Sequence, residues 1–133
     1  LGHIIATLGK PVWISSHFNH PIEITATAKR HIQGWVNLGI PFLNQSVLLA
    51  GVNDTPQILK ELFLSLIEIK VKPYYLHQAD LVQGTSHLRV PVERGLKLLK
   101  ELQGELPGYA LPHYVLDRPG GLGKIPLQNQ YTI

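Results

Sequence analysis

The 133-residue chain contains no cysteine, and only 8% of its residues are aromatic. Without cysteine it cannot form a disulfide, and by itself it cannot hold a thiolate-ligated zinc or an iron–sulfur cluster. No stretch of about 18 uninterrupted apolar residues occurs either, so the sequence predicts no membrane span. A fold of this chain therefore depends on a packed core.

Charge is also scarce, because charged residues make up 16% of the chain and the net charge is +3 at pH 7. The 12 basic residues are spread out, whereas proteins that bind nucleic acids usually cluster theirs, so we expect no nucleic-acid partner. Hydrophobic residues make up 44% of the chain. A chain of this size hides roughly 65–70% of its unfolded surface on folding, so we expect one globular domain over residues 1–133.

The opening segment, LGHIIATLGK, lacks the charged start and the small-residue cleavage site of a signal peptide. We therefore expect a cytoplasmic protein. The segment is typical of the end of a helix, which indicates a chain that begins mid-protein.

Four apolar runs predict β-strands, and three amphipathic stretches between them predict helices. The predicted strands cover residues 11–16, 41–49, 71–77 and 109–117, and the predicted helices cover about 23–37, 56–67 and 91–102. The second helix has Asp54 or Thr55 as its N-cap and Pro56 in its first turn. Helical connections of this length join parallel strands in right-handed crossovers, so we expect an α/β fold in which successive strands are neighbours.

Four such strands form half of a barrel or half of an open sheet with helices on one face, and the functional edge lies at the carboxyl ends of the strands. Polar residues gather at this predicted edge: His17, Gln45, Ser46, His77, Asp80, Asp117 and Lys124. Three consecutive polar residues, 44–46, also interrupt the second apolar strand, and such an interruption requires a reason.

The glycine-rich segment PGGLGK follows the last predicted strand. A phosphate-binding P-loop would need glycine and Ser or Thr where this chain has Arg118 and Ile125. The dinucleotide-binding fingerprint fails as well, because no helix follows the loop. What remains is a loop that presents Lys124, whose amine can form a Schiff base with an aldehyde. The alternative is a solvated lysine in a surface turn.

Two of the three aspartates in the chain, Asp80 and Asp117, come just after neighbouring predicted strands. Backbones of paired strands lie about 4.8 Å apart, and two carboxylates that close repel each other unless a cation lies between them. The pair therefore predicts a ligand with a positive group, such as a primary ammonium, or a metal. The alternative is that each aspartate forms a turn with its own backbone.

The segment HFNH, residues 17–20, places two imidazoles three residues apart without a third ligand type nearby, so we expect a loop and no metal site. His31 and His113 fall inside predicted elements and are expected to be packing residues. A metal-dependent hydrolase that uses Asp80, Asp117 and His17 is an alternative, although nothing else in the sequence completes a metal site.

Four segments together resemble the lysine 2,3-aminomutases, radical enzymes that use S-adenosylmethionine, a [4Fe–4S] cluster and pyridoxal phosphate. The segments are HFNHP (17–21), LNQSVLLAGVND (43–54), KPYYLHQAD (72–80) and YVLDRPGGLGKIP (114–126). The resemblance spans residues 11–133. It implies the C-terminal half of a radical-enzyme partial TIM-like barrel, in which residues 109–133 form the strand, loop and tail that carry the cofactor lysine.

The resemblance implies roles for five residues. Lys124 would form the Schiff base with pyridoxal phosphate. Asp80 and Asp117 would bind the ε-ammonium of substrate lysine, and Gln45 and His17 would lie on the S-adenosylmethionine side of the pocket. The implied reaction interconverts L-α-lysine and L-β-lysine by a radical 1,2-amino shift. Two carboxylates would repel the side chain of a glutamate substrate, so the resemblance favours lysine as the substrate.

The sequence departs from the family at the cluster, which relatives hold with a CxxxCxxC segment that this chain lacks. We therefore expect the chain to correspond to a fragment that is inactive alone and cannot bind the cluster. Its exposed strand edge predicts a homo-oligomer. The alternatives are a non-catalytic, self-associating α/β module and the family branch that makes β-lysine for modifying a translation factor.

Overall fold

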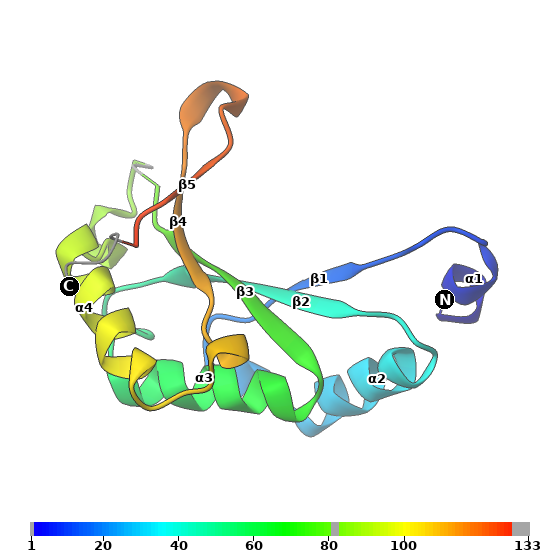
Figure 1. Cartoon of the computed structure of the whole chain (residues 1–133). Coiled ribbons are helices and arrows are strands. Elements are labelled where there is room, and N and C mark those ends of the chain that lie inside the picture. Colours follow the sequence, from blue (N-terminus) through cyan, green and yellow to red (C-terminus); the bar gives the residue numbers. More distant parts are fainter. Residues whose placement is uncertain (1, 81–82, 129–133) are drawn as a thin grey trace.

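The computed structural model describes residues 2–80 and 83–128, which contain one five-stranded sheet (Figure 1). The strands are β1 (Ile14–His17), β2 (Phe42–Leu48), β3 (Val71–Gln78), β4 (His113–Asp117) and β5 (Lys124–Pro126). They lie in sequence order, with β1 to β4 parallel and β5 antiparallel to β4. The predicted α/β class with parallel β-α-β repeats is confirmed, whereas the half-barrel stays a prediction.

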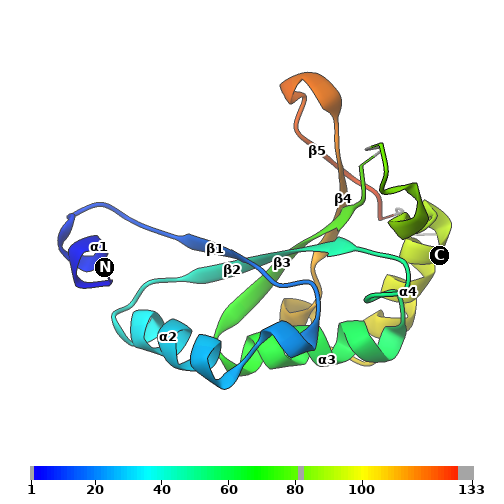
Figure 2. The ribbon, with the colours of Figure 1, turned by 180° about the vertical axis from the view of Figure 1, so that it is seen from behind.

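Helices cover one face of this sheet. The α-helices are α1 (Gly2–Thr7), α2 (Ala26–Asn37), α3 (Pro56–Glu68) and α4 (Val92–Gln103). Figures 1 and 2 show α2, α3 and α4 on the same side of the strands, with α1 at the end far from α4. No described helix covers the opposite side, which we call the open face. None of the helices in residues 2–80 and 83–128 is long and apolar enough to cross a membrane.

The core lies between the sheet and helices α3 and α4, as the amphipathic patterns predict. Helix α3 begins at the predicted position because Thr55, its N-cap, accepts a hydrogen bond from the Ile58 amide. The helix buries four apolar residues: Leu59, Leu62, Phe63 and Leu66. Helix α4 packs closely on β4 because Gly95 lies directly against the buried Tyr114.

The contacts of β2 explain why polar residues 44–46 interrupt its apolar sequence. Its residues alternate between buried and half-buried, so Asn44 and Ser46 face the helices while Gln45 lies on the open face. Asn44 Oδ1 accepts a hydrogen bond from the Phe18 amide at 2.9 Å, and its Nδ2 donates to the Phe18 carbonyl at 3.2 Å. The Ser46 hydroxyl donates to the same carbonyl at 2.6 Å. Two of the three polar residues therefore hold the loop after β1 in place.

Strand β3 contains a β-bulge that changes which side chains reach the open face. Asn44 lies opposite Pro73 and Gln45 lies opposite Tyr75, so Tyr74 is an extra residue. Because side chains alternate along a strand, the extra residue moves His77 to the open face and leaves Gln78 buried under the helices.

The end of the chain differs from the sequence-based expectation. The fourth strand begins only at His113, because residues 108–110 form a 3₁₀ turn. The segment after Asp117, predicted to be a loop, returns as strand β5. Gly120, Gly121 and Gly123 have φ between 72° and 79°, a region open mainly to glycine, and this allows the tight reversal. Residues 129–133, the end of the predicted tail, lie outside the described residues.

Candidate functional site

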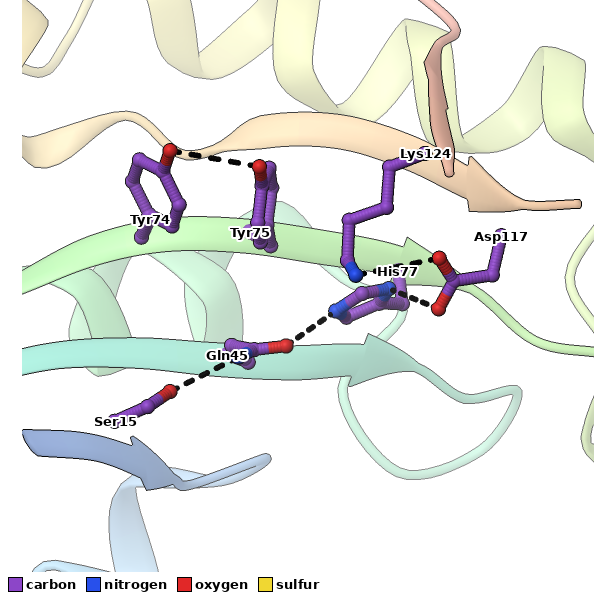
Figure 3. A network of polar contacts seen from close by, with 7 residues as sticks. All are labelled: Ser15, Gln45, Tyr74, Tyr75, His77, Asp117 and Lys124. Atoms are coloured by element: carbon purple, nitrogen blue, oxygen red, sulfur yellow. Dashed lines mark hydrogen bonds and ion pairs between the residues drawn. The ribbon is translucent and has the colours of Figure 1, made fainter. Parts of the chain in front are cut away.

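Five polar side chains, one from each strand, form a continuous row across the open face (Figure 3). They are Ser15, Gln45, His77, Asp117 and Lys124. Most of them lie toward the carboxyl ends of the parallel strands, where α/β proteins bind their ligands.

The two residues nearest the hairpin form an ion pair. Asp117 and Lys124 are opposite each other in the antiparallel β4–β5 pairing, so their side chains point to the same face. Lys124 Nζ lies 3.3 Å from Asp117 Oδ1, and it lies 5.4 Å from the centre of the Tyr75 ring. The Lys124 side chain is 33% exposed, so its amine is held between an acid and an aromatic ring but stays accessible.

His77 lies at the centre of the row. Its Nε2 is 2.8 Å from Gln45 Oε1, and its Nδ1 is 3.8 Å from Asp117 Oδ2. Burial lowers the pKa of His77 below its usual value, and the positive charge of Lys124 acts in the same direction, against the carboxylate of Asp117. The ring is therefore neutral near pH 7 and carries one N–H hydrogen.

Asp80 follows β3 and lines a pocket of about 370 Å³ together with Gln45, His77 and Asp117. Leu88, on the loop between β3 and α4, forms part of another wall. The two acids that the sequence singled out thus border the same pocket. The negative charge of Asp80 also acts on His77, as does that of Asp117.

His17, the last residue of β1, pairs in register with Gln45. Its side chain is exposed, and it lies close enough to His77 for their charges to interact. The structure therefore brings all five predicted site residues to one edge of the sheet. Lys124 and Asp117 are in direct contact, Gln45 joins them through His77, and Asp80 lines the same pocket as Gln45 and Asp117.

The sequence assigned no role to His77, Ser15 or Tyr75, although His77 was placed at the carboxyl edge. The contacts of these three residues depend on the β3 bulge and on the register between strands. No residue type in the sequence indicates either feature. The expectation that His31 and His113 are packing residues is wrong, because both are exposed. His113 instead meets the Tyr74 ring edge-on, with the ring centres 6.0 Å apart.

In the HFNH segment His17 ends β1, and residues 18–20 form the predicted loop. His20 Nδ1 accepts a hydrogen bond from the Ile22 amide at 3.1 Å, and Glu23 Oε1 accepts from the amides of Asn19 and His20. These contacts make His20 and Glu23 a capping box for the following turn. Within residues 2–80 and 83–128, no three His, Cys, Asp or Glu side chains are grouped as a metal ion would require.

The fold and the row of polar residues define the class of protein. It is an α/β protein with a parallel sheet, in which side chains from adjacent strands line a pocket at the carboxyl edge and a lysine amine lies beside an acid. Such sites bind small molecules.

Comparisons with known proteins identify the family. The sequence model of the lysine-2,3-aminomutase family matches residues 99–133. The chain is 47% identical over 123 residues to the L-lysine 2,3-aminomutase of Methanococcus maripaludis and 48% identical over 123 residues to that of Acetoanaerobium sticklandii. It is also 42% identical over 123 residues to the glutamate 2,3-aminomutase of Clostridioides difficile.

Each of these three alignments covers 92% of this chain but only 28%, 30% and 29% of the respective relative. The chain belongs to the lysine 2,3-aminomutase family and corresponds to a C-terminal part of these relatives. It spans less than a third of their length.

Proposed function

We propose that this chain is the part of a lysine 2,3-aminomutase that carries pyridoxal phosphate on Lys124 and binds the side-chain ammonium of L-lysine with Asp80 and Asp117. The observation that carries the proposal is the position of the Lys124 amine, 3.3 Å from Asp117 and next to a pocket that Asp80 and Asp117 both line. The parent enzyme would interconvert L-α-lysine and L-β-lysine by a radical 1,2-amino shift and would act in the cytoplasm.

The surroundings of Lys124 fit an aromatic aldehyde cofactor. The amine is accessible on the open face, and the Tyr75 ring offers a flat apolar surface 5.4 Å from it. The facing carboxylate of Asp117 would stabilise positive charge on a nitrogen at this place. When bound, pyridoxal phosphate supplies a conjugated ring system that holds the migrating amino group. Lys124 holds the cofactor, and Asp117 and Tyr75 orient the lysine side chain.

The charge of the pocket supports a substrate with a positive side chain. Asp80 and Asp117 repel each other across the pocket unless a cation is shared between them. In this structure the Lys124 ammonium already pairs with Asp117. Once Lys124 is engaged with the cofactor, the ε-ammonium of a lysine substrate would replace it. The side-chain carboxylate of glutamate would instead be repelled.

Gln45 and His17, on β2 and β1, would face S-adenosylmethionine on the far side of the pocket from Lys124. The iron–sulfur cluster that cleaves it would belong to another part of the parent enzyme, because this chain contains no cysteine. The chain alone would therefore not catalyse the reaction. The parent polypeptide or a second copy of this chain would pair with the exposed edge of β1.

The ion pair also favours this function over a metal-dependent hydrolase. An ammonium 3.3 Å from Asp117 would repel a divalent cation bound at the same carboxylate.

The proposal is tested by adding pyridoxal phosphate to the purified chain, reducing with borohydride and mapping the modified peptides. We expect the modification on Lys124, and we expect Lys124→Arg to remove it. The matched control is Lys60→Arg, because Lys60 is a surface lysine that is also paired with an acid, Glu105, at 2.9 Å. Modification spread evenly over the lysines, or unchanged in Lys124→Arg, would contradict the proposal.

A further inference from the structure

The row of polar side chains on the open face runs from Ser15 on β1 to the Asp117–Lys124 ion pair on β4 and β5. Gln45 Nε2 donates to the Ser15 hydroxyl at 2.9 Å, and Gln45 Oε1 faces His77 Nε2 at 2.8 Å (Figure 3). The other ring nitrogen of His77 faces Asp117. His77 is therefore the link between Gln45 and the ion pair.

A neutral imidazole has one N–H and one lone pair, so His77 can donate to only one of its two neighbours. In the arrangement of Figure 3, Gln45 turns its oxygen to the ring, so the hydrogen must be on Nε2. Nδ1 then presents a lone pair to Asp117 Oδ2 at 3.8 Å, where neither atom can donate. In this arrangement the ring gives Asp117 no hydrogen bond, and Lys124 is the donor at its other oxygen.

A second arrangement is open to the same groups. If the Gln45 amide turns over, its NH₂ group donates to His77 Nε2, and the Ser15 hydroxyl donates to the Gln45 oxygen, because a hydroxyl can donate or accept. The ring hydrogen is then on Nδ1 and faces Asp117 Oδ2 at 3.8 Å. A small rotation of the half-exposed Asp117 side chain would shorten this to a hydrogen bond, and the carboxylate would then have two donors, His77 and Lys124.

We propose that His77 is a positioning residue with two settings, and that the orientation of the Gln45 amide decides whether Asp117 is bound by Lys124 alone or by Lys124 and His77 together. In the first setting Asp117 accepts a hydrogen bond from Lys124 and none from His77, so the ion pair holds the Lys124 amine. In the second setting the carboxylate is shared with His77, so the ion pair is weaker and the amine leaves it more readily. A ligand that hydrogen-bonds either the oxygen or the NH₂ group of the Gln45 amide on β2 would fix the amide in one orientation. It would thereby change the reactivity of Lys124 on β5.

The surroundings of His77 support a neutral ring. Burial lowers the pKa of His77, Lys124 and His17 lower it further, and the negative charges of Asp117 and Asp80 only partly oppose this. The Tyr75 ring, with its centre 5.6 Å away, is the aromatic neighbour of His77 on the same strand. A neutral ring near pH 7 carries the single hydrogen on which the two settings depend.

The first measurement that tests this coupling is the position of the His77 hydrogen, followed by ¹⁵N NMR in the whole chain. We expect Gln45→Leu, which removes the partner of Nε2, to move the hydrogen from Nε2 to Nδ1. A hydrogen that stays on the same nitrogen in both proteins would overturn the proposal.

The second measurement is the rate at which formaldehyde and cyanoborohydride methylate each lysine at neutral pH. We expect Gln45→Leu to raise the rate at Lys124 about threefold, within the range that one hydrogen bond can change an equilibrium. In the His77→Phe background the same Gln45→Leu change should have no effect on Lys124. An equal effect in both backgrounds would show that the coupling does not pass through His77.

Two controls separate coupling from a general loss of structure. His31→Phe removes an exposed histidine from α2, on the opposite side of the sheet from the polar row (Figure 1), so the Lys124 rate should not change. Lys60, paired with Glu105 on the surface, is the internal reference in every digest. The inference does not need the cofactor, so a chain that fails to bind pyridoxal phosphate at Lys124 can still confirm or overturn it.

Discussion

The two faces of the sheet use the same kinds of polar residue in opposite ways, and adjacent residues of β2 show this most directly. Asn44, on the helix-covered face, is 1% exposed and binds the backbone of the loop at Phe18. Gln45, on the open face, binds the side chains of Ser15 and His77. Hydrogen bonds from Asn44 to backbone groups hold the loop in one position. The side-chain partners of Gln45 can instead exchange the roles of donor and acceptor.

The same contrast recurs on β3. Gln78 is buried, donates to the Val90 carbonyl at 2.7 Å and accepts a hydrogen bond from the Tyr114 hydroxyl. His77, one residue earlier, is half-buried on the open face and belongs to the polar row. Polar groups on the covered face therefore stabilise the scaffold, whereas polar groups on the open face bind one another and stay partly accessible. Substitutions on the two faces should separate stability from function.

The largest difference in the free energy of unfolding should appear when each of the two β2 amides, Asn44 and Gln45, is replaced by leucine. Asn44→Leu removes four hydrogen bonds, to Ser16, Ser46 and both backbone groups of Phe18, and should lower the free energy of unfolding by about 4 kcal/mol. Gln45→Leu should lower it by less than about 1 kcal/mol, because its partners can turn to water. Urea unfolding measures both, and similar losses would refute the contrast between the faces.

A second test concerns the packing of α4 on β4. A β-carbon on Gly95 would lie 2.7 Å from Tyr114 Cε1, so Gly95→Ala should lower the free energy of unfolding by about 2 kcal/mol through overpacking. Gly104→Ala is the matched control, because Gly104 ends the same helix with nothing within 4 Å of its β-carbon position. Thermal and urea unfolding should show little change for the control.

A third, smaller effect should appear in the pH dependence of stability. Because the pKa of His77 is lowered from 6.5 in the folded chain, the unfolded chain binds more protons just below that pH. The stability that the neutral ring contributes is present above about pH 6.5 and is lost as the pH falls through the lowered pKa. Urea unfolding from pH 7 to pH 5 should show a steeper loss for the wild type than for His77→Gln.

The control for this experiment is His31→Gln, which removes an exposed histidine from α2. If His77→Gln follows the wild-type curve over the whole range, burial of His77 does not oppose its protonation.

The smallest effect on stability should come from the ion pair on the open face. Asp117 is 46% exposed and Lys124 is 33% exposed, so solvent screens their attraction, and Asp117→Asn should cost at most about 0.5 kcal/mol. In the presence of pyridoxal phosphate, the same change should weaken binding of L-lysine at least about tenfold if Asp117 binds its ammonium. Equilibrium dialysis with L-lysine, and with L-glutamate as a control, measures the second effect.

Much of the scaffold follows from local patterns. The sequence predicts the start of α3 at Thr55 and Pro56 and the apolar stripe of that helix, because capping and 3.6-residue periodicity act within a few residues. The alternation of strands and helices also predicts the parallel order of the first four strands. The placement of Asp80, Asp117 and Lys124 at one edge follows from the same strand order. Strand β5 was missed because three glycines are equally compatible with a loop and with a tight hairpin.

The amino-acid sequence by itself determined the α/β class and the edge of the sheet at which Asp80, Asp117 and Lys124 gather. Only the tertiary structure decided that His77 joins Gln45 to the ion pair, since one extra residue at Tyr74 changes which side chains of β3 reach the open face. It also decided that Asn44 binds a loop while Gln45 borders the pocket. The physical reason is that alternation along a strand is local, whereas the register and bulges that direct it come from the pairing of strands distant in sequence.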